Sequence, residues 1–195
     1  MPIKLGTNLP EHLIATEPEA LKDFLQAIED LGYGYVTVGD HVLGADTSVR
    51  PDWKPFFGKP PLYDRHMVWH EPLVLFGYLS AISKNLEFCT GILVGPQRQT
   101  SLLAKQAAEV DILSGGRTRF VIAAGWNDVE FEGMGVDFRK RGKIMDEQLE
   151  VLKLRQAELC LRRAAASRIP WQVPQAKPWP KLPQRQAAAG VIAWS

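Results

Sequence analysis

The stretch LEFCTGILVGPQRQTSLLAKQAAEVDILSGGRTRFVIAA, residues 86–124, decides the fold class of this chain of 195 residues. It opens with an apolar run at 86–94 and closes with another at 117–124, and both have the composition typical of strands. The segment between them has helical spacing and stops at Gly115-Gly116, where glycine commonly ends a helix. We therefore expect a strand, a helix and a second strand. The apolar face of the helix consists of Leu103, Ala107, Val110 and Leu113, and Thr100 or Ser101 is its expected N-cap.

The same alternation extends toward the N-terminus. Residues 3–9 (IKLGTNL) form a short apolar run typical of a buried strand. The helix expected after it stops at Gly32, and the run 35–38 (YVTV) is a second strand. A further helix is expected over 71–83, directly before the strand at 86–94. The apolar face of the first helix consists of Leu21, Phe24, Leu25, Ile28 and Leu31.

Toward the C-terminus, Met145, Leu149 and Leu152 mark one face of a last helix that starts near Arg139. The chain thus shows four βα units. Because parallel neighbours need helical crossovers, this alternation predicts a parallel sheet, either in a doubly wound fold or in part of a (β/α)8 barrel. Both folds place ligand chemistry at the carboxyl ends of the strands.

The character of the sequence changes near Leu154. Residues 1–154 hold 16 Lys and Arg against 21 Asp and Glu, net −5, whereas residues 155–195 hold 7 against 1, net +6. Closely spaced prolines and unpatterned tryptophans in the second part suit neither helix nor strand. We therefore expect a domain at 1–154 and an irregular or disordered tail at 155–195. Our hypothesis for the change is that the tail is translated outside the ancestral reading frame.

Composition narrows the classes of function. With 46% hydrophobic residues the chain can bury one core, and its net charge of +1 gives no reason to expect a nucleic-acid partner. No apolar run reaches the roughly 18 to 20 residues that cross a bilayer, and the N-terminus has no recognisable secretion signal. Cys89 and Cys160 are the two cysteines, so a disulfide framework is not expected. We expect a cytoplasmic protein without a membrane partner.

Four residues carry the candidate titrating chemistry. Asp40-His41 directly follows the strand at 35–38. Because imidazole titrates near neutrality, a neighbouring carboxylate would let the pair serve proton transfer, although a strand-end Asp-His can also cap a turn. His66 and His70 have a spacing that can bind zinc on a helix, but two polar residues leading into a helix are the more ordinary interpretation. We expect no metal site.

Small residues stand at the next two strand ends. Gly91-Ile92 and the run 124–127 (AGWN) would let backbone approach a flat ring, since glycine has no side chain. The alternative is that these glycines only end their strands. Between the second strand and the next helix, residues 42–69 form a long loop rich in proline and aromatic residues, and loops of this length are usually functional. This loop would form either a pocket wall or a plug.

The motifs together resemble one family. The run GYGYVTVGDH, residues 32–41, and the block TGILVGPQRQTSLLAKQAAEVDILSGGRTRFVIAAGWNDVEFEGMGVDFRKRGKIMDEQLEVLKL, residues 90–154, are similar to luciferase-like flavin-dependent oxidoreductases, especially those that use the deazaflavin coenzyme F420. The resemblance covers most of 1–154 and nothing after it. It implies a partial (β/α)8 barrel of about four βα units followed by an irregular tail.

The resemblance also implies roles for individual residues. Asp40 and His41 would contact the deazaflavin, with His41 assisting proton transfer. The cofactor would be F420, with FMN as the alternative, and the bulge after the third strand would carry a cis peptide that supports the ring. The residues that would bind the cofactor, besides Asp40, are Thr90, Gly91 and Ile92 at the third strand end and Ala124, Gly125 and Asn127 at the fourth.

The sequence leaves two functions open. The first is an F420- or FMN-dependent oxidoreductase or monooxygenase that acts on a small organic substrate and is impaired by truncation, because the phosphate site of such barrels lies after strands seven and eight. The second is a non-catalytic barrel fragment that self-associates through open strand edges. Two copies could then close as a homodimer.

Overall fold

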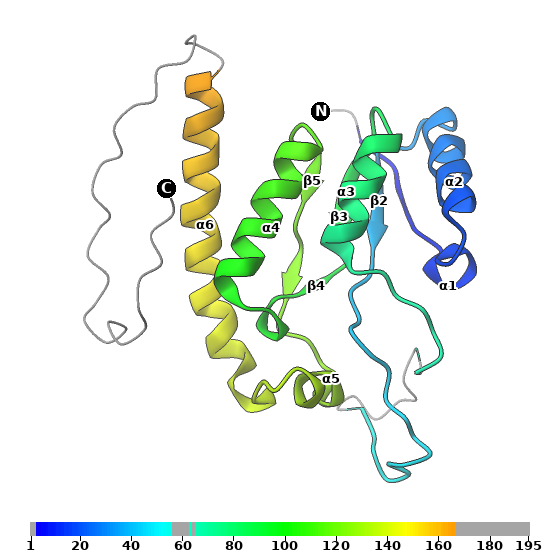
Figure 1. Ribbon diagram of the computed structural model, residues 1–195, viewed down its shortest axis with the longest axis vertical. Coiled ribbons are helices and arrows are strands. Elements are labelled where there is room, and N and C mark those ends of the chain that lie inside the picture. The colour runs from blue at the N-terminus through cyan, green and yellow to red at the C-terminus, as the bar shows by residue number, and fades with distance from the viewer. Residues whose placement is uncertain (1–2, 56–62, 64, 167–195) are drawn as a thin grey trace, which may run out of the picture. The chain divides into compact units, whose positions relative to one another are not determined.

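The protein is a parallel α/β structure built on two short sheets (Figure 1). The computed structural model describes residues 3–55, 63 and 65–166. In the first sheet, four strands pair in parallel in the order β1-β2-β3-β5, and in the second β4 pairs in parallel with β6. The predicted parallel arrangement is confirmed. The strands are β1 (Gly6–Asn8), β2 (Tyr35–Val38), β3 (Glu87–Thr90), β4 (Leu93–Val94), β5 (Thr118–Arg119) and β6 (Ile122–Ala123).

Helices follow the strands as the alternation predicts. Two short 3-10 turns, η1 (Gly95–Gln97) and η2 (Phe138–Lys140), precede α4 and α6. None of the helices in the described part of the chain has the length and apolar character to cross a bilayer. The helices are α1 (Glu11–Ile14), α2 (Pro18–Asp30), α3 (Pro72–Ile82), α4 (Thr100–Leu113), α5 (Asp128–Gly133) and α6 (Arg141–Ala166).

One face of the sheet forms the core with the helices. Val36, Val38 and Phe88 are at most 1% exposed, because alternate residues of a strand point to the same face. They pack against apolar side chains of α2, α3 and α4, and α3 and α4 lie side by side over the sheet in Figure 1. This packing orients all strands so that their carboxyl ends meet at one edge. The helical residues of the core include Leu21, Leu25, Ile28, Leu73, Phe76, Leu79, Leu103 and Val110.

The run 86–94 forms two strands rather than the one expected. After β3 the Gly91-Ile92 peptide is cis, as the resemblance implied, and β4 pairs in the second sheet. The hydroxyl group of Thr90 supplements backbone pairing at the break. It donates to the carbonyl of Val121 at 2.9 Å and accepts from its N–H at 2.8 Å, and the same carbonyl accepts from the backbone N–H of Leu93 at 2.8 Å. The expected strand at 117–124 is divided into β5 and β6 at the same level.

Two details of α4 differ from the expectation. Its N-cap is Gln99, without a side-chain cap, and Thr100 is already helical, so the predicted cap by Thr100 or Ser101 is wrong. Leu113 is 59% exposed and does not lie on the buried face, which instead includes Ala104. The helix ends as predicted.

The last helix extends beyond the expected boundary. It begins at Arg141, close to the predicted start, and continues past Leu154 to Ala166. The first part of the segment 155–195 is therefore helical rather than irregular. The prolines and tryptophans on which the tail prediction depends, from residue 170 onward, lie outside the described residues.

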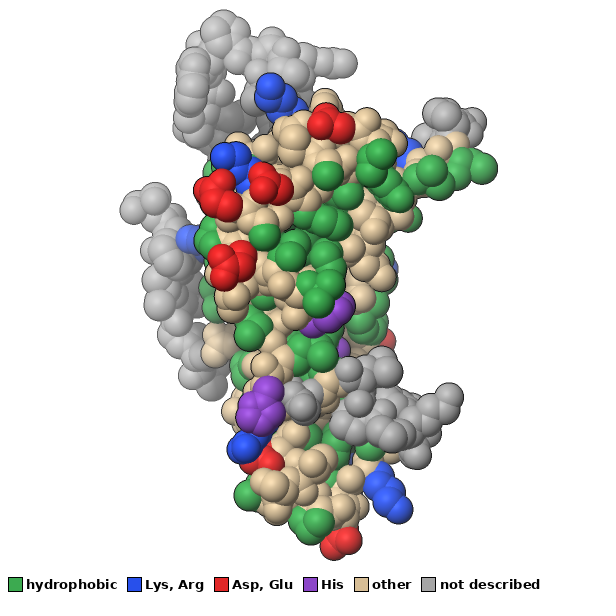
Figure 2. Space-filling model, turned by 90° about the vertical axis from the view of Figure 1, so that its right-hand side faces the viewer, with side chains coloured by type: hydrophobic (Ala, Val, Ile, Leu, Met, Phe, Trp, Pro, Cys, Tyr) green, Lys and Arg blue, Asp and Glu red, His purple; other side chains and the backbone are tan. Residues whose placement is uncertain are grey.

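The surface has exposed apolar side chains. Figure 2 shows the side of the molecule on which α1 and α2 lie, where hydrophobic side chains gather and histidine side chains lie beneath them. Leu13 and Leu31 are 72% and 75% exposed. Apolar atoms contribute a large share of any folded protein's surface, so we assign no role to this face.

Candidate functional site

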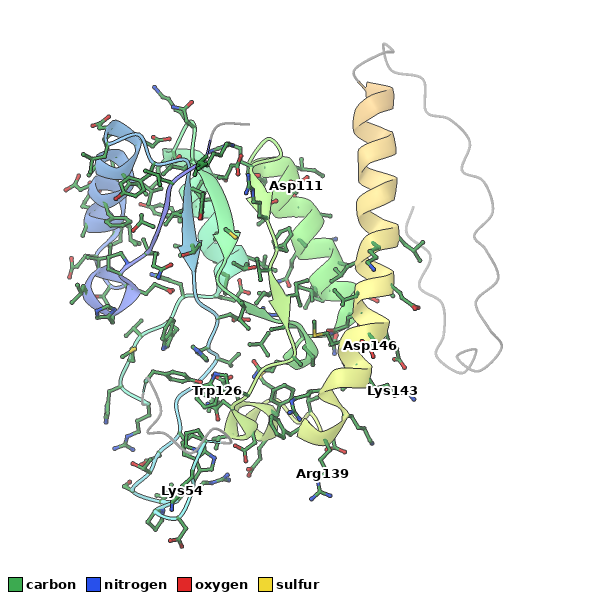
Figure 3. The ribbon with its side chains drawn as sticks, turned by 180° about the vertical axis from the view of Figure 1, so that it is seen from behind. Lys54, Asp111, Trp126, Arg139, Lys143 and Asp146 are labelled. Atoms are coloured by element: carbon green, nitrogen blue, oxygen red, sulfur yellow. The ribbon has the colours of Figure 1, made fainter. Side chains whose placement is uncertain are left out.

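The candidate site lies beyond the carboxyl ends of the strands. His41 follows β2, and α5 follows β6, so both emerge at the same edge of the sheets. Figure 3 shows Trp126 beyond the strand ends and next to α5. The described residues of the loop 42–69 form no helix or strand and bring further side chains to this edge.

His41 contacts a buried carboxylate at this edge. Its Nδ1 atom lies 2.9 Å from Oε1 of Glu130 in α5, and the two side chains are 19% and 1% exposed. The other ring nitrogen, Nε2, makes no hydrogen bond to any described residue. The ring is thus held through Nδ1, whereas Nε2 has no partner among the described residues.

Glu130 is held in turn by a network of hydrogen bonds. Its Oε1 accepts from the hydroxyl group of Tyr63 at 2.8 Å, and its Oε2 accepts from Nε2 of Gln97 at 2.8 Å. The Tyr63 oxygen accepts from Nδ2 of Asn127 at 2.8 Å. Asn127 also caps α5, because its Oδ1 accepts from the backbone N–H of Val129. The carboxylate therefore has a fixed orientation.

Aromatic rings enclose the imidazole of His41. The Tyr63 ring lies 3.8 Å away between centroids, and the rings of Trp69 and Trp126 lie 4.9 and 6.1 Å away, edge-on. Trp69 also packs on the backbone at Gly39, where a Cβ atom would come within 2.5 Å of its ring. The indole nitrogen of Trp69 is buried and has no hydrogen-bond partner among the described residues.

Asp40 has a different partner from the one expected. Its Oδ1 accepts from Nη2 of Arg98 at 2.7 Å, and its Oδ2 accepts from the backbone N–H of Val94 at 2.7 Å. Burial raises the pKa of Asp40 more than these contacts lower it. The carboxylate that contacts the His41 ring is that of Glu130, whereas Asp40 contacts Arg98 and Val94.

The residues of the third strand end differ in their exposure. Thr90 is fully buried and uses its hydroxyl group to bridge the strands. Gly91 is exposed and Ile92 is half-buried, so these two present backbone and an apolar side chain to the outside.

The residues of the fourth strand end are tightly placed. Ala124 and Gly125 are half-buried, and Gly125 has a φ of +80°, which favours glycine. A Cβ atom at Gly125 would also lie 2.6 Å from Cγ1 of Val94. Asn127 is 1% exposed, with both amide atoms bonded within the protein. Its predicted contact with a cofactor stays a prediction.

Comparison with known proteins identifies the family. The sequence model of the luciferase-like monooxygenases matches residues 3–191. The chain belongs to the luciferase-like monooxygenase family. The matched range includes most of the segment after Leu154 as well.

Two relatives of this luciferase-like chain come from Mycobacterium tuberculosis, and both are uncharacterized proteins. One is 32% identical over 148 residues, which cover 69% of this chain and 49% of the relative. The other is 31% identical over 90 residues, which cover 46% and 32%. The chain thus spans about half the length of the first of these curated relatives.

Solved structures similar to the luciferase-like chain support the barrel fold. The match to the structure of a riboflavin lyase has a TM-score of 0.61 at 16% identity, and it covers 78% of this chain and 36% of the lyase chain. The FMN complex of a diketocamphane monooxygenase from Pseudomonas putida has a TM-score of 0.57 at 12% identity, with 77% and 38% covered. An F420-dependent secondary alcohol dehydrogenase has a TM-score of 0.57 at 18% identity, with 79% and 42% covered. The fold is a partial (β/α)8 barrel.

The strand ends of the luciferase-like chain suit a flat heteroaromatic group. The exposed backbone of Gly91 and the side chain of Ile92 offer a surface without a polar side chain, and the open Nε2 of His41 lies at the same edge of the sheets. The buried indole N–H of Trp69 is a hydrogen-bond donor without a described partner. These features fit the ring of a flavin or deazaflavin.

His66 and His70 precede α3 and do not form the helical pair whose spacing can bind zinc. His66 lies in a turn and His70 in irregular backbone before α3, so the two do not share a helical face. Among the described residues, no group of three His, Cys, Asp or Glu side chains could hold a metal ion.

Sequence reasoning missed the residues that hold the site together. Glu130 lies 89 residues from His41, and no spacing rule in one sequence relates the two. Tyr63 and Trp69 were noticed only as members of an aromatic-rich loop. Gln97 and Arg98 lie at the end of η1, the short turn after β4, and their position soon after a strand is the signal by which the sequence could have indicated them.

Proposed function

We propose that the chain carries the ring-binding half of a flavin-type oxidoreductase or monooxygenase that acts on a small organic substrate, with His41 as its proton-transfer residue. The observation that supports this proposal is the His41 ring itself, anchored through Nδ1 and without a described partner at Nε2, at the same strand-end edge as the exposed Gly91. Histidine is the side chain best suited to exchange a proton near neutral pH.

The proposed cofactor is F420, with FMN as the alternative. When bound, either group supplies two-electron redox chemistry at its ring system. Gly91 and Ile92 would support one face of the ring with backbone and an apolar side chain, and Ala124 and Gly125 would line its edge. Trp69 and Trp126, beside His41, would exclude water from the reacting side.

Asp40, Thr90 and Asn127 act in this proposal as supports of the site. Each is at most 4% exposed and bonded to backbone or to side chains of the site. Asp40 holds the start of η1 through Val94 and Arg98, and Thr90 holds the break between β5 and β6. Their effect on the cofactor would be indirect.

Ligand titration of the purified chain tests the proposal. We expect F420 to raise the melting temperature and to lose fluorescence on binding, because a ligand at about 100 times its Kd stabilises the folded state by about 2.7 kcal/mol. A parallel titration with FMN shows which of the two cofactors the chain binds. His41→Asn should weaken this shift, whereas His12→Asn, at an exposed position in α1, should not. No shift with either cofactor at millimolar concentration would contradict the proposal.

A second candidate function is a non-catalytic barrel fragment that self-associates. The order β1-β2-β3-β5 places β1 and β5 at the edges of the sheet, and exposed edges invite pairing with another chain. Leu5 and Val121, close to these edges, are 66% and 48% exposed. Size-exclusion chromatography coupled to light scattering should then give a dimer whose proportion depends on concentration. A monomer at all concentrations would exclude this candidate.

A further inference from the structure

The contact between His41 and Glu130 assigns a task to a residue that the sequence did not indicate. We propose that Glu130 is a positioning residue that holds the His41 ring in the tautomer with its proton on Nδ1, so that Nε2 is the atom that accepts the proton. This inference rests on the proposed function of His41.

The hydrogen-bond directions around Glu130 support the assignment. Asn127 donates to the Tyr63 oxygen, so the Tyr63 hydroxyl group donates to Glu130. Burial raises the pKa of Tyr63, and the neighbouring Glu130 raises it as well, so the phenol keeps its proton. Gln97 donates to the second carboxylate oxygen. A carboxylate that receives a donor on each oxygen acts as an acceptor only.

The acceptor role of Glu130 determines the state of the imidazole. In a neutral imidazole one nitrogen is a donor and the other an acceptor. Because Nδ1 lies 2.9 Å from a carboxylate oxygen that only accepts, the proton of the neutral ring is on Nδ1. The lone pair is then on Nε2, which has no described partner, in a side chain that is 19% exposed.

The surroundings of the ring prevent it from exchanging its two nitrogens. The Tyr63 ring covers one face at 3.8 Å between centroids, and Trp69 lies edge-on at 4.9 Å. A rotation of the imidazole would also remove one of the three hydrogen-bond partners of a carboxylate that is 1% exposed, and a buried charge becomes more costly with each partner it loses. Glu130 therefore acts on orientation and tautomer together.

Long-range proton–nitrogen NMR spectra of the ¹⁵N-histidine-labelled protein without cofactor test this directly. We expect the signals of the neutral His41 ring to show a protonated Nδ1 and an unprotonated Nε2, and His41→Asn identifies them by their loss. The opposite tautomer in the wild-type protein would overturn the proposal without any variant at Glu130.

Variants separate the tautomer from general damage to the fold. Glu130→Leu should move the proton to Nε2, whereas Tyr63→Phe should leave it on Nδ1, because it removes a different hydrogen bond of the same carboxylate. The matched control is Glu132→Gln, two residues further in α5, where an exposed carboxylate contacts Arg50. Retention of the Nδ1 proton in a folded Glu130→Leu protein would also overturn the proposal.

Kinetics provide a second readout when the cofactor-loaded protein is active. Glu130→Leu should lower kcat by about 100-fold or more, the usual range for a lost general acid or base, and leave KM nearly unchanged, since the buried Glu130 does not reach a ligand. An unchanged kcat contradicts the inference. Failure of cofactor binding contradicts the proposed function alone, because the tautomer is measured without cofactor.

Discussion

Arg98 and Asp40 form a buried ion pair in which Nη2 of Arg98 lies 2.7 Å from Oδ1 of Asp40, with side chains that are 14% and 3% exposed. The same guanidinium group contacts Glu71, the N-cap of α3, at 2.5 Å. One cation thus joins the segment after β2, the end of η1 and the start of α3. This joint holds the strand ends on which the candidate site is built.

Arg98→Met should lower the free energy of unfolding at pH 7 by about 3 kcal/mol, because it leaves the Asp40 carboxylate buried without its cation. Burial already raises the pKa of Asp40, and Arg98 lowers it, so its pKa in the variant rises further. A folded-state pKa above the unfolded value means that the folded state gains stability as pH falls toward 3.8, where the unfolded group titrates. Urea unfolding at pH 7 and pH 5 should therefore show a smaller deficit at pH 5.

The control for this prediction is Arg50→Met, since Arg50 and Glu132 form an ion pair with 42% and 64% exposed side chains. It should cause a small, salt-sensitive loss. A deficit of Arg98→Met that grows on acidification would contradict the assigned role of Asp40.

Glu29 should show the opposite dependence on pH. Burial alone would raise its pKa, but hydrogen bonds from the backbone of Asn85 and from Ser83, among others in the same turn, outweigh this and lower it. Glu29→Gln should cost about 1 to 2 kcal/mol, reduced by solvent screening at this partly exposed site. The difference from wild type should be fully present above pH 4.5 and disappear as pH falls through the lowered pKa. Thermal melts in a pH series measure it, and a constant difference down to pH 3 argues against this role.

Gly125→Ala should be more destabilising than Gly115→Ala. Both glycines have positive φ, +80° and +71°, which costs an alanine about 1 kcal/mol. At Gly125 the new Cβ atom would also lie 2.6 Å from Val94, whereas nothing lies within 4 Å at Gly115. Chemical denaturation measures the loss of stability in each variant: Gly115→Ala has backbone strain alone, and Gly125→Ala has backbone strain and steric overlap. Equal losses would mean that the strand end around Gly125 shifts to accommodate the new Cβ atom.

Thr90→Val should lower the free energy of unfolding by about 1 to 3 kcal/mol, because the isosteric side chain leaves the backbone N–H of Val121 without its partner, whereas the C=O of Val121 keeps the N–H of Leu93. Hydrogen exchange at Val121 should become faster in this variant. Thr7→Val is the control, since the Thr7 hydroxyl group makes one long contact of 3.5 Å. Similar stability of both variants would show that pairing between the two sheets does not depend on Thr90.

The sequence predicted the order of the elements well because each helix and strand carries its own periodicity. The second strand was predicted at 35–38, where β2 lies. The division of 86–94 into two strands escaped prediction, because the composition of an apolar run is the same whether its backbone pairing continues in one sheet or passes to a second sheet. The boundary at Leu154 was placed by charge and proline content, which do not register a helix that continues to Ala166.

Prediction of the site succeeded in part for a similar reason. Functional residues of such folds lie at the carboxyl ends of strands, and this rule indicated Asp40 and His41. Their adjacency in the sequence also suggested that the Asp40 carboxylate contacts the His41 ring. Successive residues point in different directions after a strand, so Asp40 turns to Arg98 and His41 turns to Glu130. Only the folded chain brings Glu130 to the imidazole.

The separation of 89 residues between His41 and Glu130 has a consequence for biosynthesis. At translation rates of roughly 5 to 20 residues per second, Glu130 is added about 4 to 18 s after His41. During that interval the nascent chain exposes an imidazole whose carboxylate partner has not been made. The contact between His41 and Glu130 can therefore form only after α5 has been synthesised. A nascent chain that ends before α5 does not contain Glu130.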